Sequence, residues 1–355
     1  MYRIKTPIFA TMSTTAVVIL NWNGRALLEQ FLPAVVANTH SSVQLIVADN
    51  ASTDDSVVWL KQQYPQISVI RNSSNGGYAR GYNESLSQVQ ADYYVLLNSD
   101  IEVTPGWLEP LVKLMDENPD MAACQPKIRS FRHREAFEYA GAAGGFIDKW
   151  GFPFCRGRLF NTFETDNGQY DDTCDVFWAT GACLMMRATD WRAAGGLDED
   201  FFAHMEEIDL CWRLRNMGRR IGYCGNSIVY HVGGGTLSQI NPKKTFLNFR
   251  NNLVMMAKNH APGWFGVKIF LRLIIDGVAG VRFLVAGDWK HCFAVLRAHF
   301  NFYGQLPRTL RKRKKLKAGV KSYATSAVYN GSVVIAHFGF GKKHFSDLDK
   351  KKFSR

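Results

Sequence analysis

Cysteine is scarce in this chain, and no two cysteines form a C-x-x-C pair. The seven cysteines among the 355 residues are dispersed and odd in number. This spacing excludes a disulfide-stapled scaffold and a zinc ribbon, and it is typical of a protein in a reducing compartment. We therefore expect a cytoplasmic protein without structural disulfides.

Long uninterrupted hydrophobic runs are also lacking. The apolar segment 264–289 contains no window of 18 uncharged residues, so it does not predict a membrane-spanning helix. Its aromatic and cationic residues leave two interpretations open, an interfacial amphipathic helix pair or ordinary packed helices. The apolar stretch 12–20 is followed by Asn-Trp-Asn-Gly instead of a small-residue cleavage site. We therefore expect a strand and a turn there, not a signal peptide.

Before residue 308 the chain has no excess charge of either sign. The net charge of +12 lies entirely from Arg308 onward, where fourteen Lys or Arg side chains stand against two Asp. A neutral body excludes a nucleic-acid-binding surface spread over the fold, so we expect no nucleic-acid partner. The cationic tail predicts attachment to an anionic membrane surface, with a solvated tail or a protein contact as the alternative.

What is present is a globular composition, with 46% hydrophobic and 21% charged residues. In the first 130 residues, strand-length apolar runs alternate with helix-length patterns, which predicts a parallel sheet with crossover helices. The expected strands are 16–20, 43–48, 67–70 and 93–97, and the expected helices are 25–37, 54–64, 78–89 and 105–117. Residues 52–55 are expected to cap the second helix, and Pro105 is expected in the first turn of the fourth.

Farther along, segment 131–173 is irregular and rich in Gly and aromatic residues, which indicates a loop region on the acceptor side. Helices are expected near 188–194 and over 205–217, a strand over 221–230, and helical segments after that. Ligands of parallel sheets bind beyond the carboxyl ends of the strands, so the polar residues there are the candidate site. They are Asn21 and Asn23, Asp49, residues 72–77, and Asn98, Ser99 and Asp100.

Two residues suggest a metal. Asp100 ends a buried strand, where a carboxylate can hold Mg²⁺ or Mn²⁺ through oxygen; capping of the next helix is the other interpretation. His231 stands before a triple glycine at a strand end. A lone histidine is more often structural, but this one is a candidate second ligand beside Asp100.

Other residues suggest a nucleotide. Asp49 offers an acceptor for a base N–H group. Residues 75–81 form a Gly-rich turn that enters a helix, and its backbone N–H groups together with Arg80 suit a diphosphate. The turn matches neither G-x-G-x-x-G nor the P-loop pattern.

Adjacent glutamates open a predicted helix. Acidic residues in a first helical turn are favoured by the helix dipole, which is one interpretation of Glu206 and Glu207. Because they are adjacent and follow an aromatic pair, we also expect one of them to face a pocket as a general base. Asp209 and Arg213 are expected to form an ordinary i, i+4 pair.

The order and spacing of these motifs over about residues 14–240 resemble the family-2 inverting glycosyltransferases with the GT-A fold, especially bacterial members of the rhamnosyltransferase type. The matching motifs are VILNWNG (18–24), DNASTD (49–54), NGGYARGYN (75–83), ADYYVLLNSD (91–100), TGAC (180–183), GGLDE (195–199), FF (201–202), EEIDLCWR (206–213) and His231 with its glycines.

The resemblance implies an α/β fold of GT-A type, a mostly parallel sheet with crossover helices, over residues 1–240. Nucleotide-sugar binding would occupy about 14–130, the acceptor side and base 131–240, and a helical, basic, membrane-surface extension 241–355. The implied roles are nucleobase contact for Asp49, the nucleotide-sugar site for Asn21, Asn23, Asn75, Arg80, Asn98 and Ser99, divalent metal binding for Asp100 with His231, and the base for Glu207 beside Glu206. Asn98 stands where the fuller metal motif has its first Asp, and Glu206–Glu207 where the family has Glu-Asp.

The implied reaction moves a sugar with inversion from dTDP-rhamnose or a UDP-sugar to a polyprenyl-diphosphate-linked saccharide. Its setting would be bacterial cell-surface polysaccharide synthesis, on the cytoplasmic face of the cell membrane. Two alternatives stay open. A nucleotidyltransferase lacks support because no Gly-rich loop with a basic signature follows the first strand, and a non-catalytic nucleotide-sugar-binding membrane-surface protein is disfavoured because Asp100 and Glu207 are intact.

Overall fold

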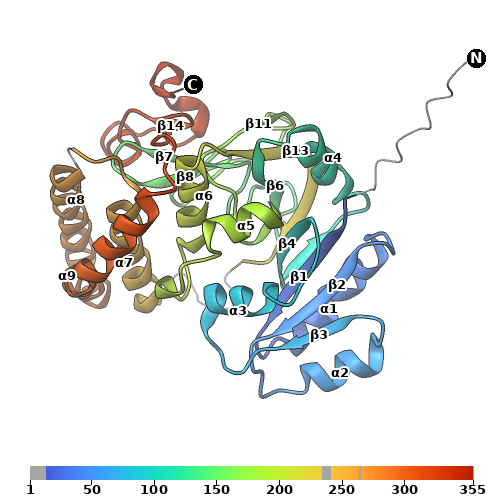
Figure 1. Ribbon diagram of the computed structural model, residues 1–355. Coiled ribbons are helices and arrows are strands. Elements are labelled where there is room, and N and C mark those ends of the chain that lie inside the picture. The colour runs from blue at the N-terminus through green and yellow to red at the C-terminus, as the bar shows by residue number, and fades with distance from the viewer. Residues whose placement is uncertain (1–12, 234–240, 264, 355) are drawn as a thin grey trace, which may run out of the picture.

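The computed structural model describes residues 13–233, 241–263 and 265–354 (Figure 1). Met12, Gly234, Gly235 and Trp264, which belong to the expected motifs, lie outside the described residues. Within them, nine strands form a mixed sheet in the order β11-β13-β6-β12-β4-β1-β2-β3, with β5 paired to β13. These strands are β1 (Thr15–Asn21), β2 (Gln44–Asp49), β3 (Ser68–Arg71), β4 (Tyr93–Asn98), β5 (Ile101–Val103), β6 (Met121–Ser130), β11 (Thr173–Asp175), β12 (Cys183–Arg187) and β13 (Arg220–His231).

The first half of the chain has the predicted parallel arrangement. Strand β1 pairs in parallel with β2 and β4, and β2 pairs in parallel with β3. The connecting helices are α1 (Arg25–Ala37), α2 (Ser56–Gln63), α3 (Gly77–Leu86) and α4 (Glu109–Glu117). The expectation for Pro105 is wrong: α4 begins four residues later, at Glu109, with Pro110 in its first turn.

Alternating residues of β1 bury against helices on the two faces of the sheet. Val18 packs in one apolar core with Tyr82 of α3, while Val17 packs in another with Leu28 of α1 and Leu60 of α2. A strand buried on both faces requires the continuous apolar run seen in the sequence.

The second half makes the sheet mixed. Strand β12 runs antiparallel to both β4 and β6, and β13 runs parallel to β6. The end of β13 pairs antiparallel with β5, which sets His231 opposite Ile101. Helices of this half are α5 (Ala188–Ala194), the short η1 (Glu199–Phe201) and α6 (Glu206–Asn216), as the sequence predicts for 188–194 and 205–217.

The segment expected to be irregular contributes all but one of the described strands of a second small sheet. Its described strands, in the order β10-β9-β8-β7-β14, are β7 (Gly145–Asp148), β8 (Pro153–Cys155), β9 (Arg158–Leu159), β10 (Thr162–Phe163) and β14 (Val328–Tyr329). Strands of two to four residues are too short to show a period, which is why the sequence did not predict them.

The C-terminal segment folds back onto this small sheet. Strand β14 pairs in parallel with β7. The segment contains three short helical turns, η2 (Ile335–Gly339), η3 (Phe345–Asp347) and η4 (Lys350–Lys352). The ring of Phe345, in η3, lies 5.2 Å from the ring of Phe146, and the ring of Phe353, just after η4, lies 5.5 Å from it. Residues 318–354 are therefore folded, and the basic side chains from Arg308 onward are carried partly by packed structure.

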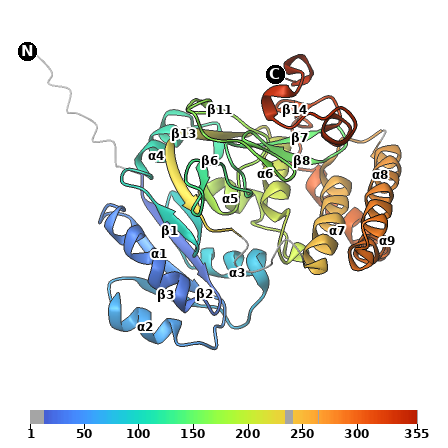
Figure 2. The ribbon, with the colours of Figure 1, turned by 180° about the vertical axis from the view of Figure 1, so that it is seen from behind.

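Three longer helices complete the molecule: α7 (Pro242–Asn259), α8 (Phe265–Val285) and α9 (Trp289–Lys317). Helix α7 packs against α6 and α9. The α8–α9 hairpin forms the edge of the molecule farthest from β3, as both views show (Figures 1 and 2). Among the described helices, none is long and apolar enough to cross a membrane.

Candidate active site

The carboxyl ends of β1, β2 and β4 are level. Asn21 lies opposite Asp49 in the β1–β2 register, and Leu20 lies opposite Asn98 in the β1–β4 register. The fully buried Asn21 amide donates to Asp49 Oδ1 over 3.2 Å, and the Ser52 backbone N–H donates to Asp49 Oδ2 over 3.2 Å. The Asp49 carboxylate is thus held at the sheet edge, where the sequence places it.

Asn23 and Ser99 border the same edge. Asn23 has a positive φ of 49°, and its Oδ1 accepts the Thr53 backbone N–H over 2.7 Å, which joins the loops after β1 and β2. A Cβ at Gly24 would lie 2.5 Å from Asn21 Oδ1 and 3.9 Å from Ser99 Oγ, so the loop after β1 meets the end of β4 at a glycine.

The Gly-rich turn is supported by a residue that the sequence did not single out. Buried Asn50 donates to Asn75 Oδ1 over 3.0 Å, and Asn75 Oδ1 also accepts the Gly77 N–H over 3.0 Å. Arg80 instead pairs with Glu84 along α3 at 2.6 Å. Asn75 is therefore linked to the strand ends, whereas Arg80 is engaged elsewhere in this structure.

Asp100 and His231 come together as the sequence suggests. The β5–β13 pairing places His231 Nε2 3.1 Å from Asp100 Oδ1, and both side chains are buried. Glu138, a residue that the sequence did not reveal, lies on the other side of the imidazole, with Oε2 2.9 Å from His231 Nδ1. The three side chains form a row with the histidine in the middle.

The charges in this row support one another. Burial by itself lowers the pKa of His231, but Glu138 and Asp100 outweigh it and raise that pKa to about 10. Burial favours the neutral carboxyls, yet the pKa values of Asp100 and Glu138 are lowered because each faces the imidazole. These shifts favour a charged imidazole between two carboxylates, so His231 Nε2 must release its proton before it can bind a metal.

Asp100 and His231 have the donor chemistry of a divalent metal site. A carboxylate oxygen and an imidazole nitrogen already lie on adjacent strand ends, and Glu138 holds the outer ring nitrogen, as carboxylates do behind metal-binding histidines. Among the described residues, no cluster of three or more His, Cys, Asp or Glu is arranged to hold a metal. Asp100 and a deprotonated His231 are thus two donors, fewer than a divalent cation takes in a complete protein site.

The glutamate pair begins α6. Glu206 is buried and Glu207 half-buried, and the Oε2 atoms of both lack a hydrogen-bond partner among the described residues. Burial raises the pKa of Glu207 to about 7, although backbone hydrogen bonds from Glu207, Ile208 and Gly181 oppose it. Burial and the charge of Glu207 also raise the pKa of Glu206. These carboxyls therefore hold or accept a proton near neutral pH.

The loop before this pair has an unusual backbone. Phe202, His204 and Met205 all have positive φ values, between 63° and 73°, which non-glycine residues rarely adopt. Asn251 of α7 donates to the carbonyl groups of Phe201, Ala203 and His204 over 3.1, 2.9 and 2.7 Å. Helix α7 thereby holds the strained turn that presents the glutamates.

The turn also contacts the nucleotide side of the sheet. The Tyr78 backbone N–H donates to the Phe202 carbonyl over 3.0 Å, and the Tyr78 hydroxyl donates to the Gly181 carbonyl over 2.6 Å. The start of α3, which follows the Gly-rich turn, is thus joined to the loop before the glutamates and to the motif at 180–183.

Asp209 confirms one prediction and extends it. Its Oδ2 lies 2.9 Å from Arg213 Nε, the expected i, i+4 pair, and also 2.9 Å from Lys258 Nζ. The Asn259 amide donates to Asp209 Oδ1 over 2.7 Å. Asp209 is therefore a fully buried anchor between α6 and α7, so it is not available as a base.

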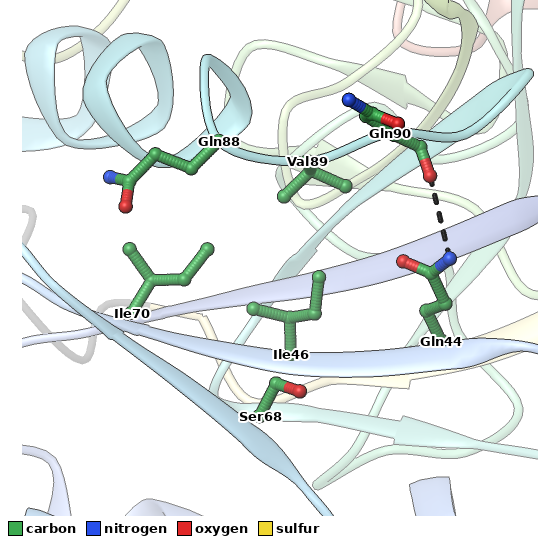
Figure 3. A pocket seen from close by; sticks show the side chains of 7 residues that line it. All are labelled: Gln44, Ile46, Ser68, Ile70, Gln88, Val89 and Gln90. Carbon is green, nitrogen blue, oxygen red and sulfur yellow. Dashed lines mark hydrogen bonds between the residues drawn. The ribbon is translucent and has the colours of Figure 1, made fainter.

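A hollow of about 430 Å³ lies on the sheet away from these residues (Figure 3). Its lining comes from the amino ends of β2 and β3 and from the segment after α3: Gln44, Ile46, Ser68, Ile70, Gln88, Val89 and Gln90. Asp49 and Arg71 mark the opposite ends of the same strands. The hollow is therefore separate from the candidate site.

The mixed sheet with polar residues at level strand ends has the architecture of the GT-A fold, which is a fold of glycosyltransferases. Residues 16–188 match the family model for glycosyl transferase family 2. The chain therefore carries a family-2 glycosyltransferase domain, as the order of its motifs predicts.

Its relatives have related activities. The chain is 24% identical over 310 residues to an N-acetylglucosaminyl-diphospho-decaprenol L-rhamnosyltransferase of Mycobacterium tuberculosis, covering 82% of this chain and 94% of the relative. It is 22% identical to the low-salt glycan biosynthesis hexosyltransferase Agl10 of Haloferax volcanii, covering 67% and 74%.

Solved structures support the fold. GalNAc-T7 with UDP, GalNAc and Mn²⁺ superposes with a TM-score of 0.55 at 14% identity, over 70% of this chain and 48% of that one, just under half its length. The mannosyltransferase PcManGT from Pyrobaculum calidifontis, in complex with GDP-Man and Mn²⁺, superposes with a TM-score of 0.51 at 12% identity, over 83% and 88%. At these identities the likeness establishes the fold alone.

Proposed function

We propose that this protein transfers a sugar, with inversion, from dTDP-rhamnose or a UDP-sugar to a polyprenyl-diphosphate-linked saccharide in bacterial cell-surface polysaccharide synthesis. The observation that carries the proposal is the Glu206–Glu207 pair at the end of a strained turn that is linked to the Gly-rich turn side of the sheet. The Oε2 atoms of both glutamates have no hydrogen-bond partner among the described residues. The rhamnosyltransferase relative, whose name specifies an N-acetylglucosaminyl-diphospho-decaprenol acceptor, supports the acceptor class.

Glu207 is the general base of the proposed reaction. Its pKa of about 7 lets it take a proton from an acceptor hydroxyl near neutral pH. Burial and the neighbouring Glu207 also raise the pKa of Glu206, which disfavours two adjacent negative charges. The deprotonated hydroxyl oxygen attacks the anomeric carbon from the face opposite the leaving nucleoside diphosphate, so a single displacement inverts that centre.

Asp49, Asn75, Asn98 and Ser99 are proposed to bind the donor, because the sheet register and the loop contacts bring them to one edge. Asp100 and His231 would hold Mg²⁺ or Mn²⁺, which supplies positive charge to the departing diphosphate. Arg80 is also proposed to bind the donor. Because its guanidinium is exposed, it can leave Glu84 and pair with a donor phosphate instead.

The proposed acceptor sits in a membrane, so we place the enzyme at the cytoplasmic face of the cell membrane as a peripheral protein. The basic C-terminal segment supports this location, although Lys312 and Arg308 already pair with Asp200 at 2.5 and 2.6 Å. A truncation near Leu306 would remove packed residues as well as charge, so it does not test location cleanly.

A donor and acceptor screen tests the function. The full chain is incubated with dTDP-rhamnose or UDP-sugars, Mn²⁺ and a short-chain polyprenyl-diphosphate N-acetylglucosamine, and nucleoside diphosphate release is measured. The anomeric configuration of the product is then read by NMR. We expect release that depends on the acceptor, is lost in Glu207→Gln, and gives an inverted product. A retained configuration, or Glu207→Gln with wild-type turnover, would contradict the proposed mechanism.

A further inference from the structure

Helix α8 buries charged residues and exposes apolar ones, the opposite of an ordinary amphipathic surface helix. Its buried residues are Arg272, Asp276 and Gly280. Its exposed apolar residues recur every three or four positions: Val267, Phe270, Ile274, Val278, Val281 and Val285. A helix on the surface of a globular protein normally turns its apolar stripe inward, so this one exposes the stripe that it should bury.

Polar contacts fix that rotation. Arg272 Nε lies 2.8 Å from Asp276 Oδ1, and Arg272 Nη1 donates to Asn252 Oδ1 of α7 over 2.5 Å. The guanidinium also lies 3.5 Å from the centre of the Phe152 ring. Turning α8 to bury its apolar side would carry this charged pair out to solvent and break its contacts with Asn252 and Phe152, so the outward stripe is a built feature of the fold.

Helix α9 continues the surface. It buries Ala294, Val295, Ala298 and Phe302, and exposes Trp289, Phe293, Leu296, Phe300 and Tyr303 at the same spacing of three and four. The two stripes join at the tip of the hairpin, where Val285 is 84% exposed and Trp289 62% exposed. We call these exposed apolar residues of α8 and α9 the outer face of the hairpin.

The surroundings of the outer face are cationic and aromatic. Arg282, Lys290 and Arg297 are exposed on the hairpin, against Asp288 in its turn. The Arg282 guanidinium lies 4.5 Å from the centre of the ring of Phe338, which together with the exposed Phe340, Lys342 and Lys343 extends the surface beyond α8. Two copies of this face would oppose like charges, whereas anionic lipid headgroups complement them and the aromatic rings suit the bilayer interface.

We propose that the outer face of the α8–α9 hairpin inserts into the interfacial layer of an anionic bilayer, parallel to its surface. The attachment is then mainly apolar and helical, with the basic side chains as a secondary contribution. The inference deepens the proposed function, on which it rests for the membrane-bound acceptor, by naming the surface that contacts the lipid.

The test compares binding of the full chain to vesicles of phosphatidylcholine with and without phosphatidylglycerol. The double variant Phe270→Gln/Phe300→Gln alters the outer face without touching the buried Arg272 network. A matched control, Val58→Gln/Phe163→Gln, replaces two exposed apolar residues elsewhere on the molecule, and Lys350→Gln/Lys351→Gln/Lys352→Gln removes exposed charge from the C-terminal segment. Circular dichroism and thermal unfolding confirm that each variant is folded.

We expect the outer-face variant to bind mixed vesicles roughly tenfold or more weakly at both low and high salt, because the apolar contribution is insensitive to salt. The Val58/Phe163 variant should bind like wild type, and the lysine variant should lose only salt-sensitive binding. Brominated lipid should quench wild-type tryptophan fluorescence more than that of Trp289→Phe, since Trp289 enters the bilayer.

Equal vesicle binding by wild type and the outer-face variant would overturn the inference. A second result would also overturn it: wild type forms a dimer in sedimentation velocity, the outer-face variant does not, and the two bind vesicles equally. In that case a second copy of the chain covers the face. Nucleotide-sugar turnover on a water-soluble acceptor should be the same in wild type and variant. If no donor is turned over at all, the proposed function fails while the vesicle result still decides this inference.

Discussion

The Nδ1 atom of His231 lies 2.9 Å from Oε2 of Glu138, although 93 residues separate the two. Both side chains are buried, and the Glu138 carboxylate also accepts the Ala140 backbone N–H over 2.5 Å. Glu138 therefore fixes the imidazole so that Nε2 faces Asp100, which makes Glu138 a positioning residue for the proposed metal site.

Removing this support should weaken metal binding. We expect Glu138→Ala to lower the affinity of the nucleotide-loaded protein for Mn²⁺ by about 10- to 100-fold, measured by titration calorimetry with UDP or dTDP present. Glu138→Gln, which keeps a hydrogen-bonding oxygen, should recover part of the affinity. Unchanged affinity in Glu138→Ala with an unchanged unfolding temperature would show that His231 needs no support from Glu138.

Asp100 should be needed for transfer. Asp100→Asn keeps the shape of the side chain but removes the carboxylate that faces His231, so most turnover should be lost. Asp116→Asn, a carboxylate on α4 with a hydrogen bond to Tyr93, is the matched control and should retain activity. Near wild-type turnover of Asp100→Asn, or full wild-type activity in excess chelator, would rule out the metal role.

The adjacent glutamates should differ in their kinetics. Glu207→Gln should lower kcat by roughly a hundredfold or more and leave donor binding near normal, as expected for loss of a general base. Glu206→Gln should retain much more activity, because Glu207 remains as the base. If Glu206→Gln has the large kcat loss instead, the base is Glu206.

Activity should rise with pH through neutrality. Burial raises the pKa of Glu207 to about 7, so below that value the base is protonated and inactive, and above it the base is charged and active. The kcat profile of wild type should therefore increase between about pH 6 and 8 and then level. A profile that is flat over this range would show that Glu207 does not titrate in the rate-limiting step.

The strained turn before α6 should depend on Asn251. Asn251→Ala removes the side-chain amide that donates to three carbonyl groups, so we expect a loss of about 1–3 kcal/mol in the free energy of unfolding. The turn also presents Glu207. We therefore expect kcat to fall even at temperatures where the variant is still fully folded, so that unfolding cannot account for the loss. Asn301→Ala, an exposed residue of α9, serves as the control and should change neither quantity.

The sequence predicted the features that arise from local repetition. The parallel half of the sheet followed from apolar runs such as 93–97 and from the helix pattern at 25–37, whose bounds the structure reproduces. The meeting of Asp100 with His231 followed from placing both at strand ends. What the sequence missed depends on distant contacts: Glu138 lies in a segment without a period, and Asn251 reaches the loop before α6 from a helix 47 residues away.

The basic C-terminal segment is a second case in which distant contacts could not be predicted from the sequence. Its charge is visible in the composition, but the pairing of β14 with β7 and the packing of Phe353 on Phe146 involve residues too few and too isolated for a pattern. Composition therefore predicted a tail, whereas the structure places its first part in α9 and packs its last part against the second sheet.

That pairing also sets an order of folding during synthesis. The Val333 backbone N–H donates to Asp148 Oδ2 over 3.0 Å, and 185 residues separate the two. At ribosomal rates of about 5–20 residues per second, β7 emerges roughly ten to forty seconds before its partner strand exists. In that interval the rings of Phe146 and Phe154 lack their covering aromatics and the edge of β7 is open, so the small sheet is the part of the nascent chain exposed to wrong strand pairing.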